Sequence, residues 1–246
     1  MHSTASLVAD LGRLGVVSGD TLMVHASLRR VGPVDGRAAA VVRALDDAVG
    51  PAGSWMMTLG ADDDGRPFDA RTTRAERDVS VLAEVMRTTP GTQVSDHPEG
   101  RVGVRGRLAA AFTRDVPWDD YYGPGSPLER LLDAGGRVLR LGADINTVTL
   151  LHYTEYVATV PDKRRVRRSR AVTTTTGVAM RTVDCLDDSN GIVAFDGPDY
   201  FGLLLEAYLA GGHALRGLVG SATSELIDAR DLHAFGVAWM NQHLNR

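Results

Sequence analysis

The sequence predicts a single α/β domain in which a mixed central sheet is flanked by helices on both faces. Short apolar runs bounded by turn residues alternate with segments of helical periodicity along most of the chain. Its 246 residues are enough for one large α/β domain, and they contain no internal repeat, low-complexity tract or obvious linker. We therefore expect one domain that spans residues 1–246.

The first half of the chain alternates between helical and extended patterns. Leucines at positions 7, 11 and 14 recur at helical spacing, and the turn residues of 15–20 follow them. The apolar run 21–25 is then typical of a buried strand. The predicted helices span 5–14, 36–49 and 78–87, and the predicted strands span 21–25, 54–60, 92–95 and 102–104.

The second half contains the clearest helix start. Ser126 is the expected N-cap, Pro127 occupies the first helical position, and Glu129 completes a capping box. A strand over 138–141 then leads through a glycine turn into a helix that carries His152. Beyond this helix the pattern predicts a hairpin of 172–176 and 178–183, a helix over 200–210, a strand over 215–219 and a final helix over 228–243.

Composition and charge exclude several classes of protein. A hydrophobic fraction of 43% supports a sizeable core, and the net charge of −4, from 27 basic and 31 acidic residues, argues against nucleic-acid binding. The single cysteine, Cys185, excludes an internal disulfide and suits a reducing compartment. Because no signal peptide and no membrane-spanning apolar run is present, we expect a soluble cytoplasmic protein without a membrane partner.

His152 is the first candidate for catalysis. It lies near the start of a helix that follows a buried strand, where open α/β sheets bind ligands. Glu155 is one turn further on the same helical face, so it can orient the imidazole as a general base. The alternative is a hydrogen-bonded scaffold histidine. We expect no metal site, because no further His or Cys ligands are arranged nearby. The residues that can cap this helix are Asn146, Thr147 and Thr149.

Two loops at strand ends are further candidates for binding. Small residues in the loop 25–32 expose backbone N–H groups, and Ser27 adds a hydroxyl, so the loop can hold a phosphate; an ordinary strand-to-helix turn is the alternative. It is not a Walker loop, since the Gly-Lys-Ser/Thr ending is missing. The acidic run 62–64 either is a solvated loop tip or attracts a polycation. Cys185 is either a packing residue or a nucleophile.

Several blocks resemble the aminoglycoside 3-N-acetyltransferase family, in the family's order and over almost the whole chain. These are LMVHASL at 22–28, VGPV at 31–34, FDAR at 68–71, SVLAE at 80–84, GPGSPL at 123–128, LGADINTVTLLHYTEY at 141–156 and GLVG at 217–220. The resemblance implies transfer of an acetyl group from acetyl-CoA to the 3-amino group of the deoxystreptamine ring of aminoglycoside antibiotics, which confers resistance. It also implies the antibiotic N-acetyltransferase fold, distinct from the GCN5-related fold.

The resemblance also assigns residues to roles. The implied coenzyme-binding residues are His25, Ala26, Ser27, Leu28, Val31, Gly32, Ser95 and Val102. The implied base is His152, with Glu155 or Asp184 as its carboxylate and Thr149 as a donor to the developing oxyanion. The acidic residues expected to pair with substrate ammonium groups are Asp63, Asp64 and Asp187, together with the carboxylates near the base. A histidine of ordinary pKa, about 6.5, is largely neutral at pH 7 and can accept the proton of the amine.

Two alternatives to this activity stay open. A protein of the same fold can acetylate another amine, such as a metabolite, and a substrate panel separates the two. A binder that sequesters cationic drugs would need neither acetyl-CoA nor His152. The chain departs from the family pattern on the antibiotic side, at Ala61, Asn146 and Cys185. We expect a monomer or a homodimer.

The basic run 163–170 has two interpretations. It is a solvated face between the helix of His152 and the next strand, which we favour. Alternatively, one or two of its arginines meet the 3′-phosphate of coenzyme A through charge-assisted hydrogen bonds.

Overall fold

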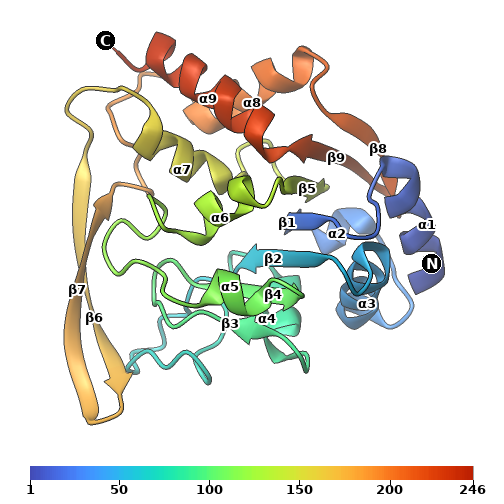
Figure 1. The fold of residues 1–246 in the computed structure, drawn as a ribbon, viewed down its shortest axis with the longest axis horizontal. Helices are drawn as coiled ribbons and strands as arrows, with labels where there is room; N and C mark the ends of the chain where they lie inside the picture. The colour runs from blue at the N-terminus through green and yellow to red at the C-terminus, as the bar shows by residue number, and fades with distance from the viewer. Residues whose placement is uncertain (246) are drawn as a thin grey trace.

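A seven-stranded mixed sheet forms the centre of the molecule in the computed structural model, which describes residues 1–245 (Figure 1). Its strands are β1 (Thr21–Ala26), β2 (Ser54–Thr58), β3 (Gln93–Val94), β4 (Val102–Gly106), β5 (Arg137–Leu141), β8 (Leu215–Val219) and β9 (Ala222–Asp228). They lie in the order β3-β4-β2-β1-β5-β9-β8. The central strands β2, β1 and β5 are parallel, and each outer strand pairs antiparallel with its inner neighbour. The predicted mixed α/β fold is confirmed.

Helices cover both faces of this sheet. They are α1 (Thr4–Leu14), α2 (Leu28–Val31), α3 (Arg37–Val49), α4 (Val81–Thr88), α5 (Ala109–Thr113), α6 (Pro127–Asp133), α7 (Leu150–Val157), α8 (Tyr200–Ala210) and α9 (Ala229–His243). The helices α1, α3 and α4 contribute to one hydrophobic core, and α5 to α9 contribute to the other. In β1, Met23 faces the second core while Leu22 and Val24 face the first. A strand buried on both faces reads as a continuous apolar run, which is the pattern of 21–25.

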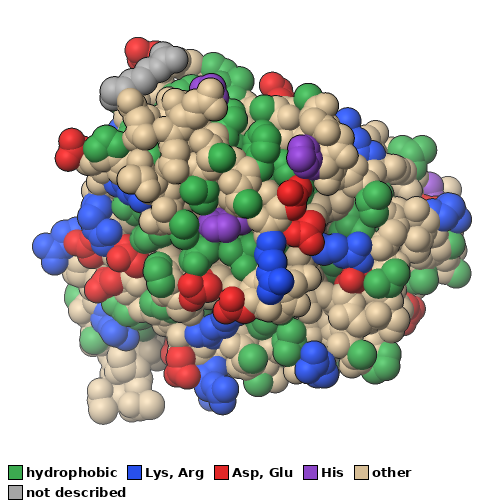
Figure 2. Space-filling model, turned by 45° about the horizontal axis from the view of Figure 1, so that its top comes forward, with side chains coloured by type: hydrophobic (Ala, Val, Ile, Leu, Met, Phe, Trp, Pro, Cys, Tyr) green, Lys and Arg blue, Asp and Glu red, His purple; other side chains and the backbone are tan. Residues whose placement is uncertain are grey.

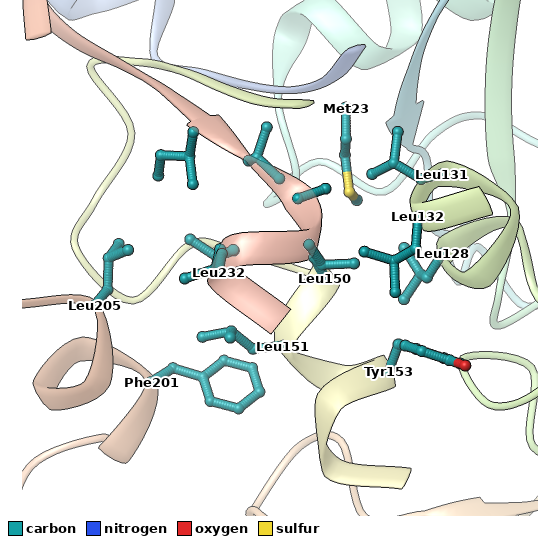
Figure 3. Close-up of a cluster of buried hydrophobic side chains, with 14 of the residues drawn as sticks. Met23, Leu128, Leu131, Leu132, Leu150, Leu151, Tyr153, Phe201, Leu205 and Leu232 are labelled. Carbon is teal, nitrogen blue, oxygen red and sulfur yellow. The ribbon is translucent and has the colours of Figure 1, made fainter. Parts of the chain in front are cut away.

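The helix α7 is held between its neighbours by its own leucines. Leu150 and Leu151 are fully buried, and Figure 3 places them among side chains of α6, α8 and α9, Leu232 of α9 among them. Gly236 of α9 allows a close approach, because a Cβ there would lie 2.9 Å from Cγ2 of Thr154. The position of His152, the third residue of α7, is therefore fixed by packing on the sides of the helix that face the core.

A long hairpin stands beside the main sheet as a separate two-stranded sheet, at the left of Figure 1. Its strands, β6 (Arg165–Thr174) and β7 (Gly177–Leu186), are longer than predicted at the ends that lie away from their connecting turn. The prediction that the basic run 163–170 precedes the strand was wrong, because Arg165 to Arg170 form its first half. The hairpin is tied to the body where Phe68 bridges to Val172.

Three other details differ from the sequence prediction. The strand β9 was missed because it follows β8 after a tight turn and carries four polar residues within its seven. Ser126 caps α6 as predicted, but Glu129 accepts from the N–H of Gly125, 2.6 Å away, and not from that of Ser126. Thr149 is the N-cap residue of α7, yet its side chain makes no capping hydrogen bond. Among the residues described, no helix combines the length and the apolar character needed to span a membrane.

Candidate active site

Two cavities are lined by residues of the segment that leads into α7. One, of about 370 Å³, is lined by His152 and Glu155 of α7, the turn 188–191 and the start of α8. The other, of about 480 Å³, lies at the carboxyl ends of β1 and β2 and is lined also by the residues that lead into α4. The segment 146–152 supplies residues to both, since Asn146 and His152 line the first cavity while Thr147 and Thr149 line the second. The two cavities therefore lie on either side of this segment.

His152 is held by a carboxylate and by two aromatic rings. Its Nδ1 lies 2.8 Å from Oε2 of Glu155, whose side chain is only 2% exposed. The ring of Tyr122 stacks on the imidazole at 5.1 Å and 7°, and Phe201 packs against it at 4.9 Å. With Nδ1–H donating to Glu155, Nε2 carries the lone pair, and no protein atom among residues 1–245 hydrogen-bonds to it.

The surroundings of His152 favour its protonated form. Burial by itself lowers the pKa of the imidazole, but the hydrogen bond and negative charge of Glu155 oppose it, and the charges of Asp188 and Asp199 add to that effect. The outcome is a pKa above the ordinary histidine value. The expectation of an unperturbed pKa near 6.5 is thus replaced by a stronger base, of which a smaller fraction is neutral at pH 7.

The first cavity is acidic, and its acidic groups are partly engaged within the protein. Asp188 accepts hydrogen bonds from Tyr121 and from Arg168, the latter at 2.6 Å. Asp199 caps the start of α8 and accepts from Asn146 at 3.0 Å. Figure 2 shows Asp and Glu side chains on one face of the molecule, with Lys and Arg side chains among them. The carboxylates that line the first cavity, those of Glu155, Asp188 and Asp199, favour a cationic ligand there.

The second cavity presents hydrogen-bond donors suited to a phosphate group, and the carboxylates of Asp78 and Asp144 line it as well. It lies at the carboxyl ends of parallel strands, where the short helix α2 and the helix α4 both begin. Ser27 is the N-cap residue of α2, but its hydroxyl makes no capping hydrogen bond and remains available to a ligand. Arg29 lines the same cavity and brings a positive charge. Backbone N–H groups, a hydroxyl and a guanidinium are the donors that phosphate groups prefer.

Comparison with known proteins identifies the family of this chain. The family model for aminoglycoside 3-N-acetyltransferase matches residues 23–241. A relative from Serratia marcescens, aminoglycoside N(3)-acetyltransferase III, is 39% identical over 99% of this chain and 98% of its own. The chain belongs to the aminoglycoside 3-N-acetyltransferase family.

Solved structures support the same conclusion. One described as AAC-IIIb binary with CoASH is 40% identical, with a TM-score of 0.94, and the match covers 99% of this chain and 97% of that one. Another, described as AAC-VIa bound to sisomicin, is 34% identical, with a TM-score of 0.94 and 99% coverage of both chains. The predictions of the family, of its fold and of an acyltransferase of this family are confirmed.

Of the residues expected to hold coenzyme A, half line the second cavity. His25, Ala26, Ser27 and Leu28 do so. Val31 and Gly32 do not, because Val31 is buried in the core under α1 and α3 and Gly32 packs near Ser221. The resemblance matched the whole loop, but α2 turns its second half away from the cavity.

Ser95 and Val102 lie outside the second cavity and bond to each other. The N–H of Ser95 donates to the carbonyl of Val102 at 3.0 Å, and the N–H of Val102 donates to Oγ of Ser95 at 2.9 Å. Both residues are buried, so the hydroxyl of Ser95 is an internal acceptor that fastens β4 to the segment after β3. Neither residue lines the second cavity.

The carboxylate that partners His152 is Glu155, not Asp184. Asp184 lies on the hairpin, where Arg165 pairs with it at 2.6 Å and Arg167 at 3.6 Å. Thr149 lines the second cavity. Its backbone N–H donates to Nε2 of His25, so only its hydroxyl is free as a donor.

The acidic residues expected to bind substrate have different surroundings. Asp187 accepts hydrogen bonds from the backbone of Ser189 and Asn190, so it stabilises a turn and does not face the first cavity as a free charge. Asp64 is exposed and lies 3.7 Å from Arg66. Asp63 lines a separate depression of about 600 Å³ between its loop and the hairpin.

Sequence reasoning missed four residues that surround His152. They are Asp188, Asp199, Tyr122 and Tyr200, none of which the sequence singles out. A signal was available for Asp199, because an Asp directly before an apolar helix is a typical N-cap. The others lie 30 to 48 residues from His152 in the sequence, and their spacing carries no local signal.

The arginines of the basic run pair within the protein. Arg165 binds Asp120 and Asp184, Arg168 binds Asp188, and Arg170 donates to the carbonyls of Ala61 and Asp62. None of them lines the second cavity, so the suggested contact with the 3′-phosphate of coenzyme A finds no support here. Within residues 1–245, no three His, Cys, Asp or Glu side chains lie together in a way that would hold a metal ion.

Proposed function

We propose that the protein transfers an acetyl group from acetyl-CoA to the 3-amino group of the deoxystreptamine ring of an aminoglycoside, and so confers resistance to such antibiotics. The observation that carries the proposal is the arrangement of two cavities on either side of the segment 146–152, one with phosphate donors at the starts of two helices and one acidic. Coenzyme A is anionic and an aminoglycoside is a polycation, so the two cavities match the two substrates. The relatives crystallised with CoASH and with sisomicin support this choice.

In this proposal the coenzyme occupies the cavity lined by His25 to Leu28. Ser27 and the backbone N–H groups at the start of α2 would bind the pyrophosphate, and Arg29 would add a charge-assisted contact. The thioester would lie near Thr149, at the boundary with the acidic cavity. The aminoglycoside would enter from the acidic side. Its ammonium groups would share Asp188 and Asp199 with the hydrogen-bond partners that these carboxylates already have.

His152 acts as the general base. Its free Nε2 accepts a proton from the amine as the nitrogen attacks the thioester carbonyl carbon, which forms the C–N bond. Glu155 then stabilises the imidazolium through Nδ1–H, and the hydroxyl of Thr149 donates to the carbonyl oxygen as it gains negative charge. When the C–S bond breaks, the thiolate of coenzyme A receives the proton back from His152, so every atom and charge is accounted for.

The proposal is tested by thiol release from acetyl-CoA in the presence of gentamicin, sisomicin, neomycin or apramycin. The native protein should release thiol only when both substrates are present. His152→Ala should reduce the rate by on the order of 10²–10⁴. A matched control is His233→Ala, because His233 bonds Thr154 on the far side of α7 and should leave the rate within a few-fold.

Other results would replace the proposal. Turnover that survives His152→Ala would keep acetyl transfer and remove the base. Thiol release with a panel of metabolite amines, but with no antibiotic, would assign the same chemistry to another acceptor. Antibiotic binding without any turnover would indicate a sequestering protein.

A further inference from the structure

A buried tyrosine hydroxyl lies behind the pair of His152 and Glu155. Tyr200, the first residue of α8, donates a hydrogen bond to Oε1 of Glu155, while His152 uses the other carboxylate oxygen. The same hydroxyl accepts the backbone N–H of Ile192 at 3.2 Å. Burial and the neighbouring carboxylate raise the pKa of Tyr200, so the hydroxyl keeps its proton and remains a donor.

The position of Tyr200 is fixed from several directions. The ring is 5% exposed and packs edge-on against Phe201 and Phe195. Gly191 leaves room for it, because a Cβ at that residue would lie 2.7 Å from Cε1 of the tyrosine. Consecutive residues of α8 thus contact both members of the pair, Tyr200 the carboxylate of Glu155 and Phe201 the imidazole of His152.

We propose that Tyr200 is a positioning residue, whose hydroxyl orients Glu155 and draws off part of its negative charge, and so sets how strongly the carboxylate holds a proton on His152. When each oxygen of a carboxylate accepts a hydrogen bond, the carboxylate is a weaker acceptor toward each donor than it would be toward one donor alone. Without the hydroxyl, Glu155 keeps one side-chain partner, His152, and its full charge acts there. The proton on His152 would then be held more tightly, and less of the free base would be present at neutral pH.

Other charged and titratable groups also face the pair, so the effect of Tyr200 must be separated from theirs. Negative charges lie in the turn after β7 and at the start of α8, and positive charges reach the site from the hairpin and the segment before it. These groups are Asp188, Asp199, Arg168 and Lys163, with the phenol of Tyr122 stacked on the imidazole. None of them bonds Tyr200, and substitutions at Tyr200 leave their charges unchanged.

The inference rests on the proposed function for its kinetic readout, but not for its physical one. In Tyr200→Phe, the acidic limb of kcat/KM against pH should move to higher pH by about 0.5 to 1 unit, a loss of roughly three- to tenfold on that limb. At alkaline pH the variant should recover to within a few-fold of the native rate, and the KM for acetyl-CoA should not change. A purely structural defect would lower kcat/KM equally at every pH.

An isosteric replacement protects the test against misfolding. Tyr200 replaced by 3-fluorotyrosine keeps the shape of the side chain but is a stronger donor, so the acidic limb should move to lower pH. Tyr153→Phe is the matched control. Tyr153, on α7, is likewise buried and donates to a glutamate, Glu129, at 2.7 Å, but its hydroxyl bonds neither Glu155 nor His152. Its pH profile should equal that of the native protein.

Titration of His152 by nitrogen NMR, in the absence of substrates, makes the outcome independent of acetyl transfer. A pKa of His152 that rises in Tyr200→Phe and falls with 3-fluorotyrosine supports the inference, even for a protein that acetylates none of the amines tested. A pKa that stays at the native value in both, or that moves the opposite way, overturns it, even for a protein that acetylates antibiotics. The two failures are therefore distinguishable.

Discussion

The backbone N–H of Thr149 donates a hydrogen bond to Nε2 of His25, 3.3 Å away. This bond joins the start of α7 to the end of β1, and both of its residues line the second cavity. Because Nε2 accepts, the proton of His25 sits on Nδ1 and the ring is neutral. Burial, with a smaller effect from the charge of Arg140, lowers the pKa of His25 to about 3.

His25 should make the protein sensitive to acid. A histidine whose pKa is lowered by folding contributes stability that is present above its unfolded value of about 6.5 and is lost as the pH falls toward its folded value. At about pH 5 the loss for one such residue is about 2 kcal/mol. The non-titrating variant His25→Gln should show a smaller drop in unfolding free energy between about pH 7.5 and 5, measured with urea. Equal drops in both proteins would mean that His25 is protonated when folded.

Glu155→Gln should move the pH dependence of the reaction in the opposite direction to Tyr200→Phe. The carboxylate raises the pKa of His152, so its removal should move the acidic limb of kcat/KM to lower pH. The maximal rate should fall by about tenfold or more, because a glutamine can no longer stabilise the imidazolium. Glu206→Gln, on the exposed side of α8, should change neither quantity. An unshifted limb in Glu155→Gln would assign the kinetic pKa to another group.

The same pair makes a prediction about stability. The folded pKa of His152 is raised, so its stabilising contribution is fully present below the unfolded value of about 6.5 and is lost as the pH rises through the folded value. The native protein should therefore lose more stability than Glu155→Gln over that interval. Urea unfolding at closely spaced pH values measures the difference, and identical slopes would argue against a coupled pair.

Substitutions at two serines should have different effects, one on the binding of acetyl-CoA and the other on stability. Ser27→Ala removes a hydroxyl with no capping bond that lines the cavity, so KM for acetyl-CoA should rise by about two- to tenfold while Tm stays constant. Ser95→Ala removes the acceptor for the N–H of Val102 and should lower the unfolding free energy by about 1 kcal/mol without changing KM. The reverse pattern would place the coenzyme beside β4.

Arg101 should stabilise the loop that follows β2. Its buried guanidinium donates to the carbonyls of Thr73 at 2.8 Å and Ala70 at 2.6 Å, and burial lowers its pKa to about 10. Arg101→Met leaves those carbonyls without their donor, so we expect a loss of about 1–3 kcal/mol and faster amide exchange in the loop. Arg77→Met is the control, since Arg77 is 81% exposed and its pair with Asp62 is worth less than about 1 kcal/mol. Equal effects would deny Arg101 this role.

Local signals explain what could be predicted of the site. His152 and Glu155 are three residues apart on one helix, so helical geometry alone brings them within 2.8 Å. The position of Ser27 after an apolar strand likewise predicted a binding loop. By contrast, the partner of Asp184 depends on which strand of a hairpin faces it, and no spacing rule supplies that information.

By itself, the sequence determined most of the buried strands, most of the helices, the placement of His152 and Glu155 on one helical face and the family to which the chain belongs. These properties follow from short-range periodicity, capping chemistry and motifs that are contiguous in the chain. Only the tertiary structure decided that Tyr200 stands behind Glu155, that Asp187 caps a turn while Asp188 faces the cavity, and that Ser95 is an internal acceptor. Such contacts join residues far apart in the chain. They form because the packing of the two cores brings these residues together, and a buried polar group is stabilised by a hydrogen-bond partner.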